Sequence, residues 1–257
     1  MFEARLTQAS MFKKILEAIK DLVENANFDC SPAGISLQAM DNAHVTLINL
    51  LLRQDGFETY SCDRSLSLGL SLPSLSKVLK CANNDDSMTI KARDEADTVT
   101  FVFESSKQER ISDFEIKLLD IGNEQYGIRD SEYSAVIKMP SAELQRICRD
   151  LSILGDVVTI SADKAGVKFS TSGDSGSGNI TVRPTTDSSI AAEDSTTIDS
   201  KEPVTLNFAL KFLSFFTKAT PLSPTVTMKM SDGVPIVVEY SIEDLGYLSF
   251  FLAPKLE

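Results

Sequence analysis

The feature that most constrains this chain is an internal repeat. Apolar residues follow the spacing of one helix face near the N-terminus, and the same spacing returns in the second half at a constant offset (144 less 12 is 132). The matching positions are Phe12, Ile15, Leu16 and Ile19 in the first copy and Leu144, Ile147, Cys148 and Leu151 in the second. A repeat of this length indicates two similar domains rather than a solenoid of short units.

Later segments keep their order but change their offset. Residues 66–70 correspond to 204–208, which gives a larger offset (204 less 66 is 138). The six additional residues fit the polar stretch 185–200, which is predicted to be a lengthened loop. Chance similarity between two unrelated α+β domains is the alternative explanation.

Each half is predicted to contain one helix, a group of strands, a second helix and further strands. Helices are expected over 11–23 with Ser10 as N-cap, from Pro73, from 140–141 and around Leu213. Strands are predicted at 27–30, 34–40, 45–52, 66–70, 88–92, 98–103, 110–117, 166–169, 179–183 and 204–208. Because strands predominate, each helix is expected to pack on one face of an antiparallel sheet, which gives an α+β fold class.

A polar, glycine-containing stretch separates the two halves. Residues 118–134 have neither a helical nor a strand period, and Gly122 and Gly127 interrupt their few apolar positions. The predicted division is therefore an N-terminal domain over 1–117, a linker over 118–134 and a C-terminal domain over 135–257.

Basic residues gather on the outward faces of the four predicted helices, at spacings of three or seven that place them on one side of each helix. They are Lys13, Lys14, Lys20, Lys77, Lys80, Arg146, Arg149, Lys211 and Lys218. Since the net charge is -12, such faces would mean that charge is separated by surface. They suit a polyanion contacted through its phosphates without sequence readout. Four ordinary solvated helix faces are the alternative.

The cysteines and apolar runs indicate the class of protein. Cys30, Cys62, Cys81 and Cys148 are scattered, which is typical of reduced thiols rather than of a disulfide framework or a zinc site. No secretory leader opens the sequence, and the longest apolar runs are far too short to span a membrane. We therefore expect an intracellular protein without a membrane segment.

The residues provide no set that would support catalysis. His44 is the sole histidine, and it is predicted to be a surface-loop residue. The glycine-rich stretch 173–179 lacks the Gly-Lys-Ser/Thr ending of a phosphate loop, and a turn before a strand explains it better. Acidic pairs such as Asp85-Asp86 lie in polar, turn-like contexts. We predict no enzymatic activity, no cofactor and no metal site.

At this point the residues resemble a known family, the sliding clamps of DNA replication, and are most similar to its eukaryotic members. The matches extend over essentially the whole chain, for example Leu75-Ser76-Lys77-Val78-Leu79-Lys80, and lie at 1–6, 40–45, 62–64, 75–80, 147–152, 215–222 and 252–255. The resemblance implies a head-to-tail homotrimer whose six domains close into a ring around duplex DNA, with the helices lining the channel. It also implies a nuclear processivity factor.

The resemblance assigns two further groups of residues. It adds Arg64 to the DNA-contacting set. It also implies that the edge strand 109–117 of one subunit pairs with 175–183 of the next, with interface residues Arg110, Ile111, Phe114, Ser177, Gly178 and Ile180. Two exposed sheet edges, blunted or covered in another way, are the alternative.

Partners follow from the same resemblance. They are replicative DNA polymerase, the clamp loader ATPase, flap endonuclease, DNA ligase and other replication and repair proteins that insert a short peptide with hydrophobic and aromatic anchors. The positions that match the peptide pocket are Met40, His44, Val45, Leu47, Tyr126, Ile128, Pro235, Ala253, Pro254 and Leu256. Lys164 matches the family's ubiquitin and SUMO acceptor, which is linked to translesion synthesis.

Two departures from relatives concern function. Tyr126 stands where some members have Leu, which would reshape the pocket, and Phe212 stands where some have Tyr, which excludes tyrosine phosphorylation there. Two other hypotheses stay open at this stage. One is a peptide-binding hub that never surrounds DNA, and the other is a nucleotide-dependent enzyme that uses residues 173–179.

Overall fold

The computed structural model describes residues 1–93, 97–122, 126–128 and 132–255. Two compact units account for the chain. The first consists of Met1–Asn42, Ile48–Tyr126 and Ile242–Leu248, and the second of Ala43–Leu47, Gly127–Ser241 and Ser249–Glu257.

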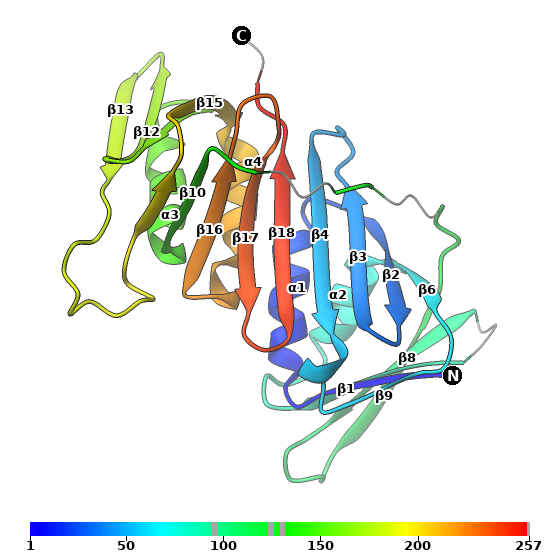
Figure 1. The fold of residues 1–257 in the computed structure, drawn as a ribbon. Coiled ribbons are helices and arrows are strands. Elements are labelled where there is room, and N and C mark those ends of the chain that lie inside the picture. Colours follow the sequence, from blue (N-terminus) through cyan, green and yellow to red (C-terminus); the bar gives the residue numbers. More distant parts are fainter. Residues whose placement is uncertain (94–96, 123–125, 129–131, 256–257) are drawn as a thin grey trace. The chain divides into compact units, whose positions relative to one another are not determined.

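The first half of the chain forms two antiparallel groups of strands and two helices (Figure 1). One group has the order β5-β1-β7-β8-β9, in which the strands are Thr59–Cys62, Phe2–Leu6, Ser87–Ala92, Thr98–Glu104 and Ile111–Lys117. The other has the order β4-β3-β2-β6, in which the strands are Thr46–Arg53, Gly34–Met40, Asn25–Ser31 and Leu66–Ser71. The helices are α1 (Ala9–Ile19) and α2 (Leu72–Leu79), and a short 3-10 turn, η1, covers Gln54–Gly56.

The second half has the same plan. One group has the order β14-β10-β16-β17-β18, in which the strands are Thr197–Ser200, Ala135–Pro140, Thr225–Met230, Ile236–Ile242 and Gly246–Leu252. The other has the order β13-β12-β11-β15, in which the strands are Gly176–Val182, Gly166–Gly173, Val157–Asp163 and Val204–Ala209. The helices are α3 (Ser141–Leu151) and α4 (Leu210–Phe216), and the 3-10 turn η2 (Thr217–Leu222) follows α4.

The predicted repeat is confirmed at the level of topology. Adding nine to each strand label in the first half gives the strand order of the second half, and α1 and α2 correspond to α3 and α4. The helix α1 begins at Ala9 and α3 begins at Ser141, which reproduces the predicted offset (141 less 9 is 132). The α+β class with antiparallel sheets is therefore correct.

The helices α1 and α2 cover one face of the β4-β3-β2-β6 group, and α1 packs against α2 (Figure 1). Along β2, Ala26, Phe28 and Cys30 are buried while the residues between them are partly exposed, as expected for a strand with one covered face. The Phe12 ring of α1 lies 6.0 Å from the Phe28 ring, which anchors the helix on the sheet. In the second half, α3 packs against α4 and η2.

Each α-helix begins with a backbone hydrogen bond to the residue that precedes a strand. The first N–H groups of α1, α2, α3 and α4 donate to the carbonyls of Asp86, Glu24, Pro224 and Asp156, at 2.7, 2.8, 2.8 and 2.9 Å. These bonds satisfy donors that a helix start would otherwise leave open. The predicted Ser10 cap is wrong for this reason, because α1 starts at Ala9, which is already bonded to Asp86.

Other element predictions differ at their ends. The first helix stops at Ile19 rather than at 23, and the expected loop 185–200 ends in the strand β14. The short edge strand β5 and the N-terminal strand β1 were not predicted. The helix predicted from Pro73 starts one residue earlier, where the Ser71 hydroxyl accepts from the Ser74 N–H. Within the described residues, no helix combines the length and apolar character needed to cross a bilayer.

Candidate functional surfaces

Three of the basic residues predicted on the first-half helices lie at C-terminal helix ends. Lys20 and Lys80 are the C-cap residues of α1 and α2, and Lys77 lies in the last turn of α2. Cations at this end of a helix are favoured by its macrodipole, a local reason for their position that does not require a ligand. In the second half, Arg149 lies in the last turn of α3.

The first-half lysines differ in how firmly they are held. The Lys13 ammonium donates to the Ala82 carbonyl beyond α2, and Lys20 pairs with Glu17 at 2.7 Å. By contrast, Lys14, Lys77 and Lys80 are exposed, and no hydrogen bond or ion pair joins their ammonium groups to another described residue. These three remain available for an external anion.

Both arginines of α3 share one carboxylate. Arg146 lies 3.6 Å and Arg149 lies 3.2 Å from oxygens of Asp150. All three side chains are at least 40% exposed, so these pairs add little stability but orient the two guanidinium groups.

The fourth basic pair departs from the predicted helical stripe. The helix α4 ends at Phe216, so Lys218 lies in η2, and the expectation of two lysines seven apart on one helix is wrong. Instead, the half-buried Phe215 ring brings them together. The Lys211 and Lys218 ammonium groups lie 6.0 and 5.0 Å from its centroid, within the range of cation–π attraction. Arg64, the remaining predicted DNA contact, lies exposed in the turn between β5 and β6.

The residues predicted for peptide binding fall in both units. In the first, Met40 at the end of β3 and Tyr126 line a polar recess of about 310 Å³, together with Asn25, Asn27, Gln38 and Ile121. In the second, the Ala253 N–H donates to the Val45 carbonyl at 3.1 Å, and the exposed His44 has a left-handed φ of 56°. Pro235 is exposed, Leu47 and Pro254 are half-buried and Ile128 is 36% exposed. Leu256 lies outside the described residues.

The predicted interface strands are the ends of their strand groups. β9 closes one side of β5-β1-β7-β8-β9, and β13 closes one side of β13-β12-β11-β15. On β9, Ile111 is 64% exposed, while Phe114 packs on Phe103 at 5.9 Å. On β13, Ile180 and Gly178 are partly exposed, and a Cβ at Gly178 would meet the Leu154 side chain at 2.9 Å. Arg110 and Ser177 are exposed at the two strand ends.

Lys164 occupies the turn between β11 and β12. It is exposed, and the neighbouring Asp163 carboxylate accepts from the N–H groups of Ala165 and Gly166 at 2.7 and 3.1 Å. This Asx-type turn presents the lysine at the tip of a rigid hairpin. The stretch 173–179 contains the turn between β12 and β13, but the turn covers only Asp174 and Ser175, and the strand predicted at 179–183 begins earlier, since β13 covers Gly176–Val182.

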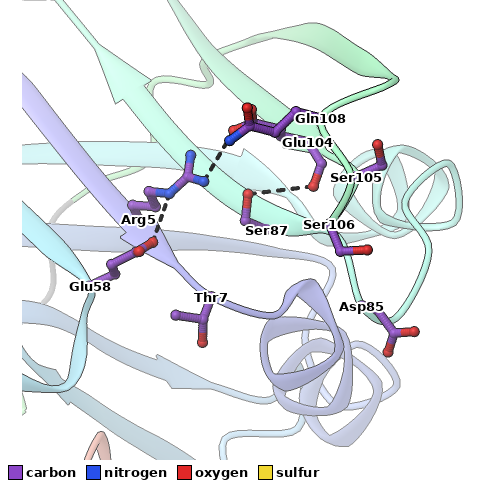
Figure 2. Close-up of a pocket in the computed structure, with 9 residues that line it drawn as sticks. All are labelled: Arg5, Thr7, Glu58, Asp85, Ser87, Glu104, Ser105, Ser106 and Gln108. Atoms are coloured by element: carbon purple, nitrogen blue, oxygen red, sulfur yellow. Dashed lines mark hydrogen bonds and ion pairs between the residues drawn. The ribbon is translucent and has the colours of Figure 1, made fainter.

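A polar recess on the first unit lies around Arg5 (Figure 2). The guanidinium pairs with Glu58 at 2.7 Å and with Glu104 at 3.1 Å, and the hydrogen bond to Glu58 raises the arginine's pKa. The other lining side chains are Thr7, Asp85, Ser87, Ser105, Ser106 and Gln108, so no histidine or cysteine is present to act as base or nucleophile. The ion pairs in this recess join β1 to β8 and to the residue before β5, which is a structural role.

The acidic residues and cysteines of the described chain do not gather into a metal-binding group. There, no group of three or more His, Cys, Asp or Glu side chains is placed to hold a metal ion. Cys30, Cys62, Cys81 and Cys148 form no disulfide. Burial raises the pKa of the Cys148 thiol to about 12, which keeps it protonated and unreactive.

Sequence reasoning missed two features of these surfaces. The Phe215 ring could have been found from its place in the sequence between Lys211 and Lys218. The side-chain amides of Asn27 and Gln38, which bond the linker, had no sequence signal, because polar residues on the outer face of a strand are ordinary.

Two sequence models and one full-length relative match this chain, and all three belong to the same family. The sequence model of the proliferating cell nuclear antigen N-terminal domain matches residues 1–126, and that of the C-terminal domain matches residues 127–255. The proliferating cell nuclear antigen of Dictyostelium discoideum is 78% identical over 258 residues, which cover 100% of this chain and 100% of that protein. Two matching domain models and a full-length relative at this identity show that the chain belongs to the proliferating cell nuclear antigen family.

Proposed function

We propose that this protein works as a DNA sliding clamp, a processivity factor for replicative DNA polymerase and a docking platform for replication and repair proteins. The observation that carries the proposal is family membership over the entire chain at 78% identity to a relative. The family is non-catalytic, which supports a role without enzymatic activity.

In the proposed assembly, three copies join head to tail. The exposed edge β9 of one subunit pairs with the edge β13 of the next, and main-chain hydrogen bonds across the seam satisfy groups that an open edge leaves unpaired. Ile111, Phe114 and Ile180 supply side-chain contacts there, Gly178 contributes backbone alone, and Arg110 and Ser177 flank them. A heterologous interface of this kind closes into a ring when its rotation permits.

Duplex DNA passes through the ring and is contacted through its phosphates. The charged groups of Lys14, Arg64, Lys77 and Lys80 have no hydrogen bond or ion pair to another described residue, and Lys13, Lys20, Arg146, Arg149, Lys211 and Lys218 complete the proposed set. Such contacts are independent of base sequence and weaken with salt. Retention on DNA then comes from the closed ring rather than from affinity.

Partner proteins bind through peptides whose anchors enter a site built from Met40, His44, Val45, Leu47, Tyr126, Ile128, Pro235 and the segment Ala253–Leu256. The partners proposed are replicative polymerase, flap endonuclease, DNA ligase and a clamp loader ATPase that opens the ring. Lys164, presented at a hairpin tip, is the proposed ubiquitin acceptor, and the nucleus is the proposed location. The division into 1–117, 118–134 and 135–257 likewise stays a prediction.

The topological mechanism is tested by loading the protein onto nicked circular DNA with a clamp loader and then linearising the circle. A clamp stays on the circle through gel filtration at about 0.2 M salt and is lost after cutting. Equal loss from both substrates contradicts encirclement and favours a peptide-binding hub. Light scattering of the free protein supplies the subunit number, and a strict monomer at micromolar concentration contradicts a stable ring.

A further inference from the structure

The linker that begins after β9 is hydrogen-bonded to the β4-β3-β2-β6 group, on the face opposite α1 and α2. Its first bonds are backbone bonds, in which the Leu118 N–H donates to the Asp97 carbonyl at 2.7 Å and the Leu119 N–H donates to the Gly69 carbonyl of β6 at 2.8 Å. The approach to Gly69 is close, since a Cβ there would lie 2.1 Å from the Leu119 oxygen. Glycine is therefore required at this crossing.

Two side-chain amides continue the attachment along the next strands. The Asn27 amide nitrogen, on β2, donates to the carbonyls of Ile121 at 3.1 Å and Gly122 at 3.4 Å. The Gln38 amide oxygen, on β3, accepts from the Tyr126 N–H at 3.0 Å. The described linker residues thus cross β6, β2 and β3 in the order of the sheet and are bonded at each strand.

The orientation of both amides is fixed by their partners. Carbonyl oxygens can only accept, so Asn27 must present its NH₂ group, and a backbone N–H can only donate, so Gln38 must present its oxygen. Asn27 therefore acts as a donor and Gln38 as an acceptor. Both residues are half-buried and line the same recess as Met40 and Tyr126.

We propose that Asn27 and Gln38 are positioning residues of the partner-peptide site, which fasten the linker so that Tyr126 is held in place before a peptide arrives. The inference rests on the proposed function, because it assigns these residues to the same peptide site. If Tyr126 is already held in its binding position, less conformational entropy is lost when a peptide binds. Loss of one fastening bond should weaken peptide binding about two- to tenfold, the range expected for a single net hydrogen bond.

The donor and acceptor roles give an asymmetric test. Asn27→Asp exchanges the donor for a carboxylate that faces two carbonyls, so it should weaken binding, and Gln38→Met, which removes the acceptor, should do the same. Gln38→Glu keeps an oxygen acceptor for the Tyr126 N–H and should restore affinity close to that of the unmodified protein. Asn25→Asp is the matched control, because Asn25 lines the recess and has no hydrogen bond to a described linker residue.

Affinity is measured by fluorescence anisotropy with a labelled synthetic peptide that carries aliphatic and aromatic anchors. Hydrogen exchange at the Tyr126 amide is measured in parallel, and it should accelerate in Gln38→Met but not in Gln38→Glu. If the unmodified protein does not bind the peptide, the proposed function fails. If it binds and all four variants bind equally well, only the positioning role of Asn27 and Gln38 is overturned.

Discussion

In both halves of the chain, the segment that follows the last strand is hydrogen-bonded back to the fold, but the side-chain bonds around this segment differ between the halves. After β9, the linker bonds the carbonyl of Gly69, and near the C-terminus, the Lys255 N–H bonds the carbonyl of Asn207 at 2.8 Å. Gly69 and Asn207 are equivalent positions of the repeat (207 less 69 is 138). In the first half Asn27 is directed to the linker, whereas its counterpart Thr159 donates to the Asn207 side chain at 2.7 Å.

This difference shows how the two copies of a duplicated fold can hold the segment that follows them with different bonds. In the second half, the side chain of Asn207 takes the hydroxyl of Thr159, so the described tail has a single backbone bond at this strand. In the first half, glycine leaves room for the linker backbone, and the side chain of Asn27 becomes free to bond it. The proposed peptide site includes both the linker and the tail, so the two halves differ in how each segment is held.

The largest expected effect on stability comes from substituting Gly69, compared with its equivalent Asn207. Gly69→Ala places a Cβ against the Leu119 carbonyl and should lower the free energy of unfolding by about 2–3 kcal/mol, a cost typical of overpacking. Asn207→Ala at the equivalent position removes one hydrogen bond and should cost about 1 kcal/mol. Urea denaturation of both variants measures the difference. Equal losses would contradict the close approach at Gly69.

Charge reversal sharpens the comparison between helix faces. Lys14 and Lys80 are equivalent to Arg146 and Lys218 of the second half, which already have partners in Asp150 and Phe215. The double variant Lys14→Glu with Lys80→Glu should weaken DNA binding about thirtyfold at low salt, assuming about 1 kcal/mol for each of the two positions, summed over the three subunits. Arg146→Glu with Lys218→Glu should weaken it by a smaller factor.

The readout is DNA affinity as a function of salt, with trimer content followed by light scattering. Loss of the trimer would mean that assembly rather than DNA contact was measured. A second-half variant that binds as weakly as the first-half variant contradicts the unequal contribution of the two faces.

A third test uses a position where the halves differ in chemistry. Cys148 occupies the place of Leu16, and its pKa of about 12 in the folded protein lies well above the usual thiol value of about 8.5 in an unfolded chain. Because the folded pKa is raised, the stabilisation is complete below about pH 8.5 and is lost as pH rises toward 12. Between pH 8.5 and 9.5 the free energy of unfolding should fall by about 1 kcal/mol from this thiol.

The measurement is the urea midpoint at several pH values for the unmodified protein and for Cys148→Ala, whose decline with pH should be shallower. Cys81→Ala is the control, since Cys81 is exposed. An identical pH dependence for the unmodified protein and Cys148→Ala would contradict the buried, protonated thiol.

The smallest effect concerns Phe215, which occupies the place of Lys77. Its ring holds two ammonium groups, so Phe215→Leu should weaken DNA binding about threefold, as expected from loss of about 0.5–1 kcal/mol of cation–π attraction. Phe215→Trp keeps an aromatic face and should retain affinity. Equal binding by the Leu and Trp variants would show that the ring is only packing.

The sequence predicts the repeated plan of the fold because it depends on hydrophobic periodicity, which is local. Helix boundaries are less predictable, as at Ala9, where the start of α1 depends on the carbonyl of Asp86, distant in the chain. The basic set was found from spacing, but the engagement of Lys13 with Ala82 and the position of Lys218 outside α4 depend on tertiary contacts. The bonds of Asn27 and Gln38 to the linker are invisible to pattern for the same reason.

The backbone bonds that start the helices also constrain how the chain can fold. The hydrogen bond at the start of α1 requires Asp86, and the bond at the start of α3 requires Pro224. Both residues lie far beyond their helix in the sequence. Helices of eight and seven residues, such as α2 and α4, are too short to persist alone in water. Folding is therefore governed by contacts remote in sequence, which makes it slow. During synthesis, neither copy of the repeat can complete its structure until nearly all of that copy has left the ribosome.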